Sequence, residues 1–330
     1  MSASFRAFVV NKTAEQFTAQ VQPLTRDDLP SGEVLIHVAY SSVNYKDALA
    51  CTPDGKVVRS YPFVPGIDLA GVVVESSDER FHAGDEVIVT SYDLGVSHFG
   101  GFSEYARVRA NWVVPLPQGL TLKEAMALGT AGFEAALAVH KLEKNGLTPQ
   151  HAPVLVTGAT GGVGSIAVNI LAKLGHTVVA STGKQAEHAY LKELGASTIL
   201  SREEVSAESN RPLEKELWAG SVDSVGGATL AYLIRTTKYG GSVAACGLTG
   251  GTTVNTTVFP FILRGVNLLG IDSVFCPMGL RRELWQRLAS DLKPTKLDTI
   301  SREVTLDELP QVTASLLMGG VRGRTVVRLG

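Results

Sequence analysis

The chain has 330 residues, 45% of them hydrophobic and 19% charged, with a formal net charge of −2, which is typical of a globular protein of about two domains. The absence of a basic block argues against a nucleic-acid partner. No apolar run approaches the roughly 18 residues of a membrane span, and the first residues lack a signal-peptide pattern, so we expect a cytoplasmic protein with no membrane partner.

The first third of the chain is rich in short β-branched or alternating runs, which glycine, proline and aspartate separate. Such runs predict the antiparallel strands of a small barrel or sandwich. They cover residues 5–10, 32–40, 69–75, 85–91 and 103–117.

A polar tetrapeptide, Asn44-Tyr45-Lys46-Asp47, follows the second of these runs. Taken locally, it is either a solvated turn after a strand or a group that the fold holds over a substrate. Asp47 is expected to cap a helix that begins in "KDALA", and Lys46 is expected to be solvated.

The pattern changes near residue 120. Residues 121–143 carry apolar side chains at intervals of three and four, which predicts a helix. Thr121 and Glu124 have the spacing of a capping box at its start.

From residue 153 onward, strand-like and helix-like segments alternate, which predicts a parallel sheet wound with helices. Strands are predicted at 153–159, 176–182, 197–201, 221–227, 240–247 and 266–272, with helices at 165–175 and 184–195. A helix at 279–292 and β-like runs at 299–306 and 322–330 follow, and we expect this tail to return to the first domain. The predicted domains are therefore 1–125 with 274–330, and 126–273.

The sharpest motif lies between the first strand of this sheet and its helix. Four glycines gather there, at Gly158, Gly161, Gly162 and Gly164. Glycines let the backbone come close to a pyrophosphate, and a helix N-terminus adds free N–H groups and a positive dipole. Strand, loop, helix and second strand in this order indicate a dinucleotide site, although Ala159 stands at the motif's first glycine position.

The end of the second strand distinguishes NAD from NADP, because an acidic residue there binds the ribose 2′-hydroxyl of NAD. No acid stands at Ser181, Thr182, Gly183 or Lys184. Hydroxyls and cations suit a 2′-phosphate instead, and Arg202 after the third strand can reach the same group. The sequence therefore predicts NADP(H), with solvated surface charges as the alternative role for the two cations.

Essentially the whole chain resembles the medium-chain dehydrogenase/reductase superfamily. The stretches that carry the resemblance are "AGVVVE", "GDEVIV", "GTAGFEAALAV", "TGATGGVGSIAV" and "LGAS". It implies a GroES-like β-rich catalytic domain joined to a Rossmann domain with a doubly wound parallel sheet.

Zinc-dependent members of that superfamily carry a catalytic Cys, a His–Glu pair and a four-cysteine lobe. This chain has Asn44-Tyr45 in the first region and "PGIDLAG" (65–71) in the second, and its three cysteines are scattered. It resembles the zinc-free branch, and we expect no metal site.

Longer stretches, "SHFGGFSEYARV", "WAGSVDSVGG", "YGGSVAACGLTGG", "TVFPFILRGVNLLGIDSV" and "RRELWQRLASDL", resemble the acrylyl-CoA reductase family, whose members are also labelled quinone oxidoreductases. The resemblance implies an oxidoreductase acting on CH–CH groups, which reduces the C2=C3 double bond of acrylyl-CoA, or of a similar small enoyl-CoA, with NADPH. It also implies a homodimer in which the last sheet strands, near 266–272, pair across the two-fold axis.

The family's cofactor contacts carry over where positions match. With the glycine loop and the strand-end residues, the predicted cofactor-binding set is Tyr45, Thr130, Gly161, Gly162, Val163, Gly164, Ser165, Ser181, Thr182, Gly183, Lys184, Arg202, Leu248, Ile262 and Ser273. The last three are expected where the carboxyl ends of the strands open onto the cleft, with plain loop packing as their alternative role.

Reduction of an activated alkene needs a hydride, a proton and a donor for the charge that develops on the thioester oxygen. Tyr45 is the preferred catalytic residue, as donor or proton relay, and Asn44 could donate to the oxyanion. Asp47 could orient Tyr45, and His98 ranks below it. Two other functions stay open: reduction of free quinones or unsaturated carbonyls, and a non-catalytic NADPH sensor.

Overall fold

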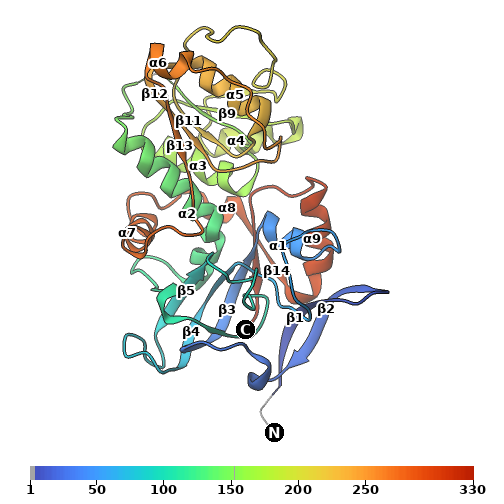
Figure 1. Cartoon of the computed structure of the whole chain (residues 1–330). Helices are drawn as coiled ribbons and strands as arrows, with labels where there is room; N and C mark the ends of the chain where they lie inside the picture. The colour runs from blue at the N-terminus through green and yellow to red at the C-terminus, as the bar shows by residue number, and fades with distance from the viewer. Residues whose placement is uncertain (1–3, 152) are drawn as a thin grey trace. The chain divides into compact units, whose positions relative to one another are not determined.

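The computed structural model describes residues 4–151 and 153–330, and the chain divides into two compact units (Figure 1). Unit 1 runs up to Thr130 and includes Val274–Ala289 and Leu297–Gly330, and unit 2 comprises Ala131–Ser273 and Ser290–Lys296. The division falls at Thr130 rather than at residue 125 because helix α2 (Leu122–Lys144) is broken at Gly129, where φ is 53° and ψ is −155°. Its first part packs with unit 1.

Unit 1 is built mainly on antiparallel strands, with one parallel pairing between β14 and β15. Strands β1 and β2 form a two-stranded sheet, and the others form one sheet in the order β14-β15-β3-β4-β5-β7, with β6 also paired to β3. The strands are β1 (Phe5–Lys12), β2 (Phe17–Leu24), β3 (Val34–Val43), β4 (Asp68–Ser76), β5 (Glu86–Thr90), β6 (Tyr105–Val108), β7 (Val113–Pro115), β14 (Ser301–Thr305) and β15 (Arg324–Arg328). The antiparallel pairing of β15 with β3 confirms that the C-terminal tail returns to this sheet.

Besides the first part of α2, unit 1 contains four helices of at most 11 residues among the described residues. They are α1 (Tyr45–Ala50), α7 (Met278–Leu288), α8 (Leu297–Ile300) and α9 (Leu309–Leu317), with single 3-10 turns η1 (Arg26–Asp28), η2 (Ala110–Trp112) and η4 (Leu306–Glu308). The predicted capping box of α2 is confirmed, since the Thr121 N–H donates to Glu124 Oε2 (2.9 Å) and the Glu124 N–H donates to Thr121 Oγ1 (3.2 Å).

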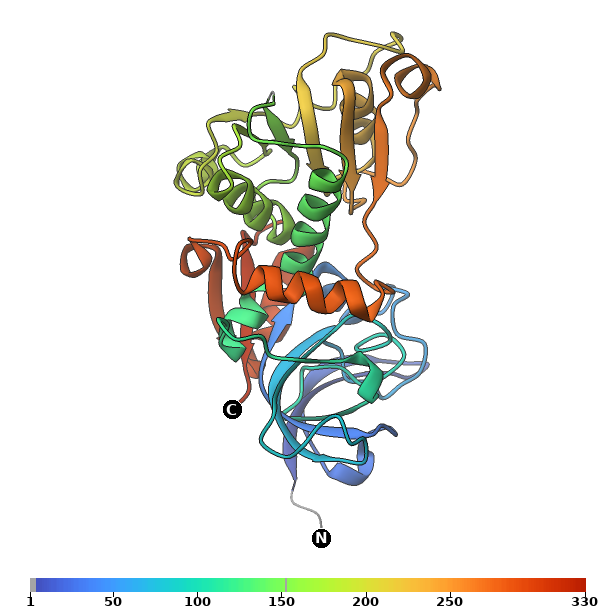
Figure 2. The same ribbon diagram turned by 90° about the vertical axis from the view of Figure 1, so that its left-hand side faces the viewer.

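Unit 2 is a six-stranded sheet in the order β10-β9-β8-β11-β12-β13, parallel at every pairing, as predicted (Figure 2). Its strands are β8 (Val154–Val156), β9 (Val178–Ser181), β10 (Thr198–Leu200), β11 (Trp218–Asp223), β12 (Thr237–Ala245) and β13 (Asn267–Gly270). Its helices besides the second part of α2 are α3 (Gly162–Lys173), α4 (His188–Glu193), α5 (Gly227–Thr236) and α6 (Phe259–Arg264), with the 3-10 turn η3 (Gln185–Glu187).

Five helices and strands were not predicted: β2, α5, α6, α8 and α9. Helix α5 begins at Gly227, directly after its N-cap Gly226, and the positive φ values of these two glycines, 54° and 74°, are typical of a turn. Strand β2 lacks a buried face, because every residue in it is partly or fully exposed. Within the described residues, no helix is both long and apolar enough to cross a membrane.

Candidate functional site

The loop between β8 and α3 has a backbone geometry that requires glycine at two positions. Gly158 has a φ of +56°, and a Cβ there would lie 2.4 Å from Ser224 Oγ. A Cβ on Gly164 would lie 2.4 Å from the Gly158 carbonyl oxygen, so the first turn of α3 packs directly on the loop. A Cβ on Gly161 would meet only that carbonyl, at 3.3 Å, which leaves its outer side open. A phosphate can therefore approach this backbone closely.

Helix α3 begins at this loop, at Gly162, earlier than the predicted start at residue 165. The N–H groups of its first turn have no intrahelical acceptors and are available to an anion. Ser165 is fully buried, and its hydroxyl donates to the Ala159 carbonyl oxygen (3.1 Å). Ala159 is buried as well, and its N–H donates to the Ser181 carbonyl oxygen of β9. The alanine at the motif's first position is thus a packing residue.

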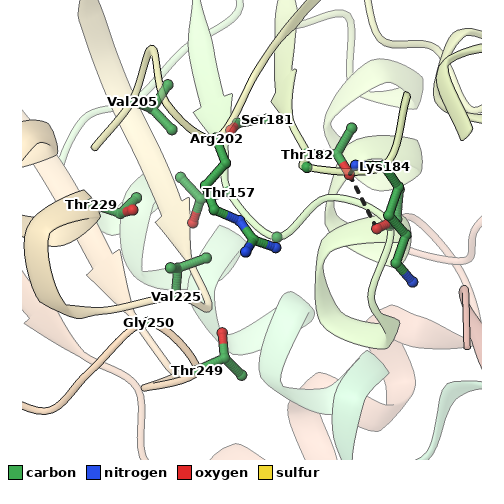
Figure 3. Close-up of a pocket in the computed structure, with 13 residues that line it drawn as sticks. Thr157, Ser181, Thr182, Lys184, Arg202, Val205, Val225, Thr229, Thr249 and Gly250 are labelled. Atoms are coloured by element: carbon green, nitrogen blue, oxygen red, sulfur yellow. Dashed lines mark hydrogen bonds between the residues drawn. The ribbon is translucent and has the colours of Figure 1, made fainter. Parts of the chain in front are cut away.

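A pocket opens beside the loop at the carboxyl ends of β8, β9 and β10 (Figure 3). It brings together five of the predicted residues, Ser181, Thr182, Gly183, Lys184 and Arg202. The other lining residues are Thr157, Gly158, Thr160, Val205, Val225, Thr229, Thr249 and Gly250. The lining contains two cations and no carboxylate, so it suits an anionic group.

The backbone beside the two cations of this pocket is closely packed. Arg202 lies against Gly183, where a Cβ would be 3.1 Å from its Nη2, and Figure 3 shows its guanidinium projecting into the pocket. The Lys184 N–H donates to Thr182 Oγ1 (3.0 Å). Desolvation, with the nearby charge of Arg202, holds the pKa of Lys184 below its usual range. An anion between the two cations would relieve that repulsion.

Three predicted cofactor residues lie elsewhere in unit 2. Leu248 is 59% exposed in the loop after β12, and Ser273 is buried after β13 with its hydroxyl donating to Glu134 Oε1 (2.7 Å). Ile262 is 69% exposed on α6, which leads into the amino end of β13. The expectation that Ile262 lies at the carboxyl ends of the strands is wrong for this reason. Its contact with a cofactor stays a prediction.

Unit 1 contains a buried polar network centred on Asp68, the first residue of β4, which is completely inaccessible. Its Oδ2 accepts hydrogen bonds from Ser42 Oγ (2.7 Å), Asn44 Nδ2 (2.8 Å) and the Thr130 N–H (2.9 Å). Its Oδ1 accepts one from Thr130 Oγ1 (2.6 Å). Arg324 Nη2 lies 3.6 Å from Oδ2 and balances the charge. Breaking such a buried pair costs about 3–5 kcal/mol.

Arg324 is itself buried and extends the network to neighbouring segments. It donates to Ser42 Oγ (2.7 Å), Asn44 Oδ1 (3.0 Å) and the Val43 carbonyl oxygen (3.2 Å). Its Nε donates to the Ala127 carbonyl oxygen (3.3 Å). The strand β15 that carries Arg324 is therefore tied to both β3 and the first part of α2.

The break in α2 makes room for this network. A Cβ on Gly129 would lie 2.5 Å from Arg324 Nη2, 2.6 Å from Asp68 Oδ2 and 2.6 Å from Ser42 Oγ. The backbone conformation of Gly129 then turns the following residue, Thr130, so that its N–H and hydroxyl both reach Asp68. Only glycine satisfies both requirements at this position.

The tetrapeptide Asn44–Asp47 forms the start of α1. Asn44 is the N-cap and its N–H donates to Asp47 Oδ2 (2.8 Å), so Asp47 occupies the third helical position and not the cap as predicted. The Asn44 amide is occupied by Asp68 and Arg324, as described above. Tyr45 is 47% exposed, and Lys46 is half-buried rather than fully solvated.

Asp47 is the second fully buried carboxylate of this region. Its Oδ2 accepts the hydrogen bond from the Asn44 N–H, and its Oδ1 accepts one from the Ile67 N–H (2.8 Å). Desolvation and the nearby charge of Asp68 raise the pKa of Asp47 to about 7. Burial and the neighbouring negative charge therefore favour the protonated form of Asp47.

His98 has a packing role in the structure. Its Nε2 lies 2.7 Å from the Arg107 carbonyl oxygen, and its ring stands edge-on to Trp112 with a centroid distance of 5.2 Å. Burial holds its pKa below the usual range.

Asp68 and Arg324 were not predicted from the sequence, although both had a detectable signal. Asp68 interrupts an apolar run in "GIDLAGVVV", and Arg324 precedes the apolar run "TVV". A charged residue at a buried strand position requires a partner. In the part of the chain that the structure describes, no group of three or more His, Cys, Asp or Glu residues could hold a metal ion.

Two family models match the chain. The model described as "Alcohol dehydrogenase GroES-like domain" matches residues 30–118, and the one described as "Zinc-binding dehydrogenase" matches residues 162–290.

Curated relatives match over nearly the full length. The "Putative quinone oxidoreductase YhfP" of Bacillus subtilis is 56% identical over 330 residues, all of both chains. The "Acrylyl-CoA reductase AcuI" of Ruegeria pomeroyi is 54% identical over 325 residues, or 98% of each chain.

Solved structures agree with the fold. The yhdH oxidoreductase of Salmonella enterica in complex with NADP is 49% identical, with a TM-score of 0.96 over 98% of this chain and 100% of that chain. The B. subtilis yhfP protein with NAD bound has a TM-score of 0.97 at 56% identity, over 99% of this chain and 100% of that chain.

Asp47 should make the stability of the protein depend on pH. Its pKa is raised from 3.8 to about 7, so the folded protein binds this proton more tightly than the unfolded chain. The resulting stabilisation is complete at low pH and is lost as the pH rises through this interval. Between about pH 5 and about pH 7, we expect the unfolding free energy of the wild type to fall relative to that of Asp47→Asn by about 1.4 kcal/mol per pH unit, measured by urea denaturation.

The matched control is Asp54→Asn, because Asp54 is exposed on the loop that follows α1. Its curve should run parallel to that of the wild type. If the wild type and Asp47→Asn depended on pH in the same way, the assignment of the buried proton to Asp47 would be wrong.

Proposed function

The chain belongs to the zinc-free medium-chain dehydrogenase/reductase family that contains acrylyl-CoA reductases and quinone oxidoreductases, and we propose that it reduces the C2=C3 double bond of acrylyl-CoA, or of a similar small enoyl-CoA, with NADPH. The observation that carries the proposal is the 54% identity to an acrylyl-CoA reductase over 98% of both chains. The name of the 56% identical relative favours a second candidate, reduction of quinones.

The pocket of unit 2 supports NADPH as the reductant. The loop at Gly158–Gly164 and the start of α3 fit a pyrophosphate, because glycine backbone and free N–H groups meet there. Ser181, Thr182, Lys184 and Arg202 would hold the ribose 2′-phosphate, since no carboxylate lines the pocket to prefer a 2′-hydroxyl. When bound, the cofactor supplies the hydride. The remaining contacts that we propose are Tyr45, Thr130, Val163, Ser165, Leu248, Ile262 and Ser273.

The residues at the start of α1 are proposed to handle charge and the proton. Reduction adds a hydride at C3 and a proton at C2, and negative charge gathers on the thioester oxygen between these events. The Tyr45 hydroxyl would donate a hydrogen bond to that oxygen or relay the proton, since the side chain is 47% exposed. Asn44 is then a positioning residue, because its amide is engaged by Asp68 and Arg324 and fixes the start of α1.

The edge of the sheet in unit 2 supports a homodimer. Strand β13 pairs with β12 on one side only, so its other edge is open. Exposed apolar side chains gather on β13 and the adjoining α6 and include Val258, Phe259, Ile262, Leu263 and Leu268. An open apolar edge is an aggregation hazard unless another chain covers it. A second copy that pairs β13 with β13 across a two-fold axis would cover it.

The activity is tested by following NADPH absorbance with acrylyl-CoA, crotonyl-CoA and a benzoquinone. We expect the highest kcat/KM with acrylyl-CoA, and we expect Tyr45→Phe to lower it about tenfold, because Tyr45 assists the reaction without being its main source of rate. Tyr239→Phe, at an exposed tyrosine of unit 2, is the control. Faster turnover of the quinone would favour the second candidate, and NADPH binding without any turnover would favour a sensor. Unchanged kinetics of Tyr45→Phe would remove Tyr45 from the mechanism.

The choice of cofactor is tested by binding alone. Arg202→Ala removes a charge-assisted contact worth about 1.5–3 kcal/mol, so we expect the Kd for NADPH to rise roughly 10- to 150-fold with little change for NADH. Fluorescence titration measures both constants, and Arg211→Ala, an exposed arginine outside this pocket, is the control. An equal loss for both cofactors, or a wild type that binds NADH as tightly as NADPH, would contradict the assignment.

The dimer is tested by light scattering. We expect the wild type to have the mass of two chains and Leu268→Glu, with a charge on β13, to have the mass of one, because a charge opposite its own copy at an apolar interface is unfavourable. Met318→Glu, at a residue that is 80% exposed at the end of α9, should leave the mass unchanged. A wild-type monomer would contradict the proposal.

A further inference from the structure

The loop that follows α1 in unit 1 is folded tightly against the end of that helix. The Thr52 N–H and hydroxyl both donate to the Leu49 carbonyl oxygen, at 3.0 and 2.9 Å. A Cβ on Gly55 would lie 1.8 Å from the same oxygen, so the chain passes directly over the helix end. The backbone at Lys56 is therefore fixed near the C-terminal end of α1, the helix that begins at Tyr45.

The next residues of this loop alternate between the core and solvent. Val57 is half-buried and Val58 is 8% exposed, and both pack in the apolar cluster of unit 1. Lys56 and Arg59, on either side of the valines, are exposed. Further along, Phe63 exchanges backbone hydrogen bonds with Val10 of β1. The backbone of the loop is thus anchored at both ends, while its two cations face water.

These two cations have no ion-pair partner among the described residues, whereas two other arginines of unit 1 do. Arg80 pairs with Asp78, and Arg6 pairs with Asp307. Within residues 4–151 and 153–330, by contrast, no ion pair or hydrogen bond joins the side chain of Lys56 or Arg59 to another residue. Asp54 is the exposed acid nearest in sequence, so the exposed loop keeps a net positive charge.

We propose that Lys56 and Arg59 bind the phosphates of the CoA portion of the substrate, an inference that rests on the proposed enoyl-CoA reductase function. CoA carries a diphosphate and a 3′-phosphate, and a lysine and an arginine are the side chains that pair with such groups. Three residues of extended chain separate the two cations by at most about 10 Å, so both can reach one nucleotide.

The location of the loop also fits the shape of an acyl-CoA thioester. The pantetheine arm holds the acyl group well away from the phosphates. Helix α1 begins at Tyr45, the proposed oxyanion donor, and its six residues rise about 9 Å toward the loop that carries Lys56. Lys46, half-buried on α1, adds positive charge along the way. The acyl end and the phosphate end of the substrate thus have separate sites on one segment of the chain.

The experiment compares acrylyl-CoA with acrylyl-pantetheine, which lacks the phosphates. For the double variant Lys56→Ala/Arg59→Ala, we expect the KM for acrylyl-CoA to rise at least tenfold with kcat within about twofold, because charge-assisted contacts to the ground state are lost. The KM for acrylyl-pantetheine and the Kd for NADPH should not change. Lys144→Ala, which removes one positive charge at an exposed lysine in the last turn of α2, is the control.

Each outcome decides the proposal. A double variant with an unchanged KM for acrylyl-CoA, or with an equal rise for both thioesters, would overturn it. A wild type that reduces both thioesters with equal KM would overturn it while leaving the reductase function standing. If the wild type reduces neither thioester, the reductase function fails and calorimetric titration with CoA alone decides: binding that the double variant weakens tenfold supports the phosphate site, and no binding to the wild type rejects it.

Discussion

The buried carboxylate of Asp68 has to be neutralised and hydrogen-bonded where it stands, and this requirement organises the centre of unit 1. A charge without access to water is tolerated only when partners replace its hydration. Those partners come from β3, from the start of α1, from the break in α2 and from β15. Three regions that are distant in sequence, namely the junction of β3 and α1, the break in α2 and strand β15, are thereby held at fixed positions around one side chain.

This constraint explains why α1 starts where it does. The amide of Asn44 donates to Asp68 with its nitrogen and accepts from Arg324 with its oxygen, so its orientation is fixed on both sides. The next residue, Tyr45, is then directed away from the network and is 47% exposed. A saturated polar network is rigid, so the backbone that carries Tyr45, the residue we propose as the oxyanion donor, is held in place. The network therefore suits positioning rather than proton transfer.

The sequence predicted which residues line the pocket of unit 2 at the ends of β9 and β10, because the pattern that places them is local. Strand, glycine loop and helix are contiguous over residues 153–175, and the parallel order of β8, β9 and β10 brings Ser181 and Arg202 to the same edge. The Asp68 network could not be predicted in the same way, because Arg324 lies on the last strand of the chain and no local pattern names its partner. The role of Asp47 was misassigned by one helical turn, since Asn and Asp both cap helices and only the structure shows which one does.

The buried Arg324 of unit 1 and the cations that line the pocket of unit 2 lie in opposite surroundings. In unit 1, Arg324 is buried and its guanidinium is fully used by carbonyl, hydroxyl, amide and carboxylate oxygens, so it adds no capacity to bind a ligand. In unit 2, Arg202 and Lys184 line a pocket that contains no carboxylate, and desolvation already lowers the pKa of Lys184. Cations held together in this way gain stability when an anion arrives. The charge of Arg324 is satisfied within the fold and holds the start of α1 in place, whereas the positive charge that lines the pocket of unit 2 suits an anionic ligand.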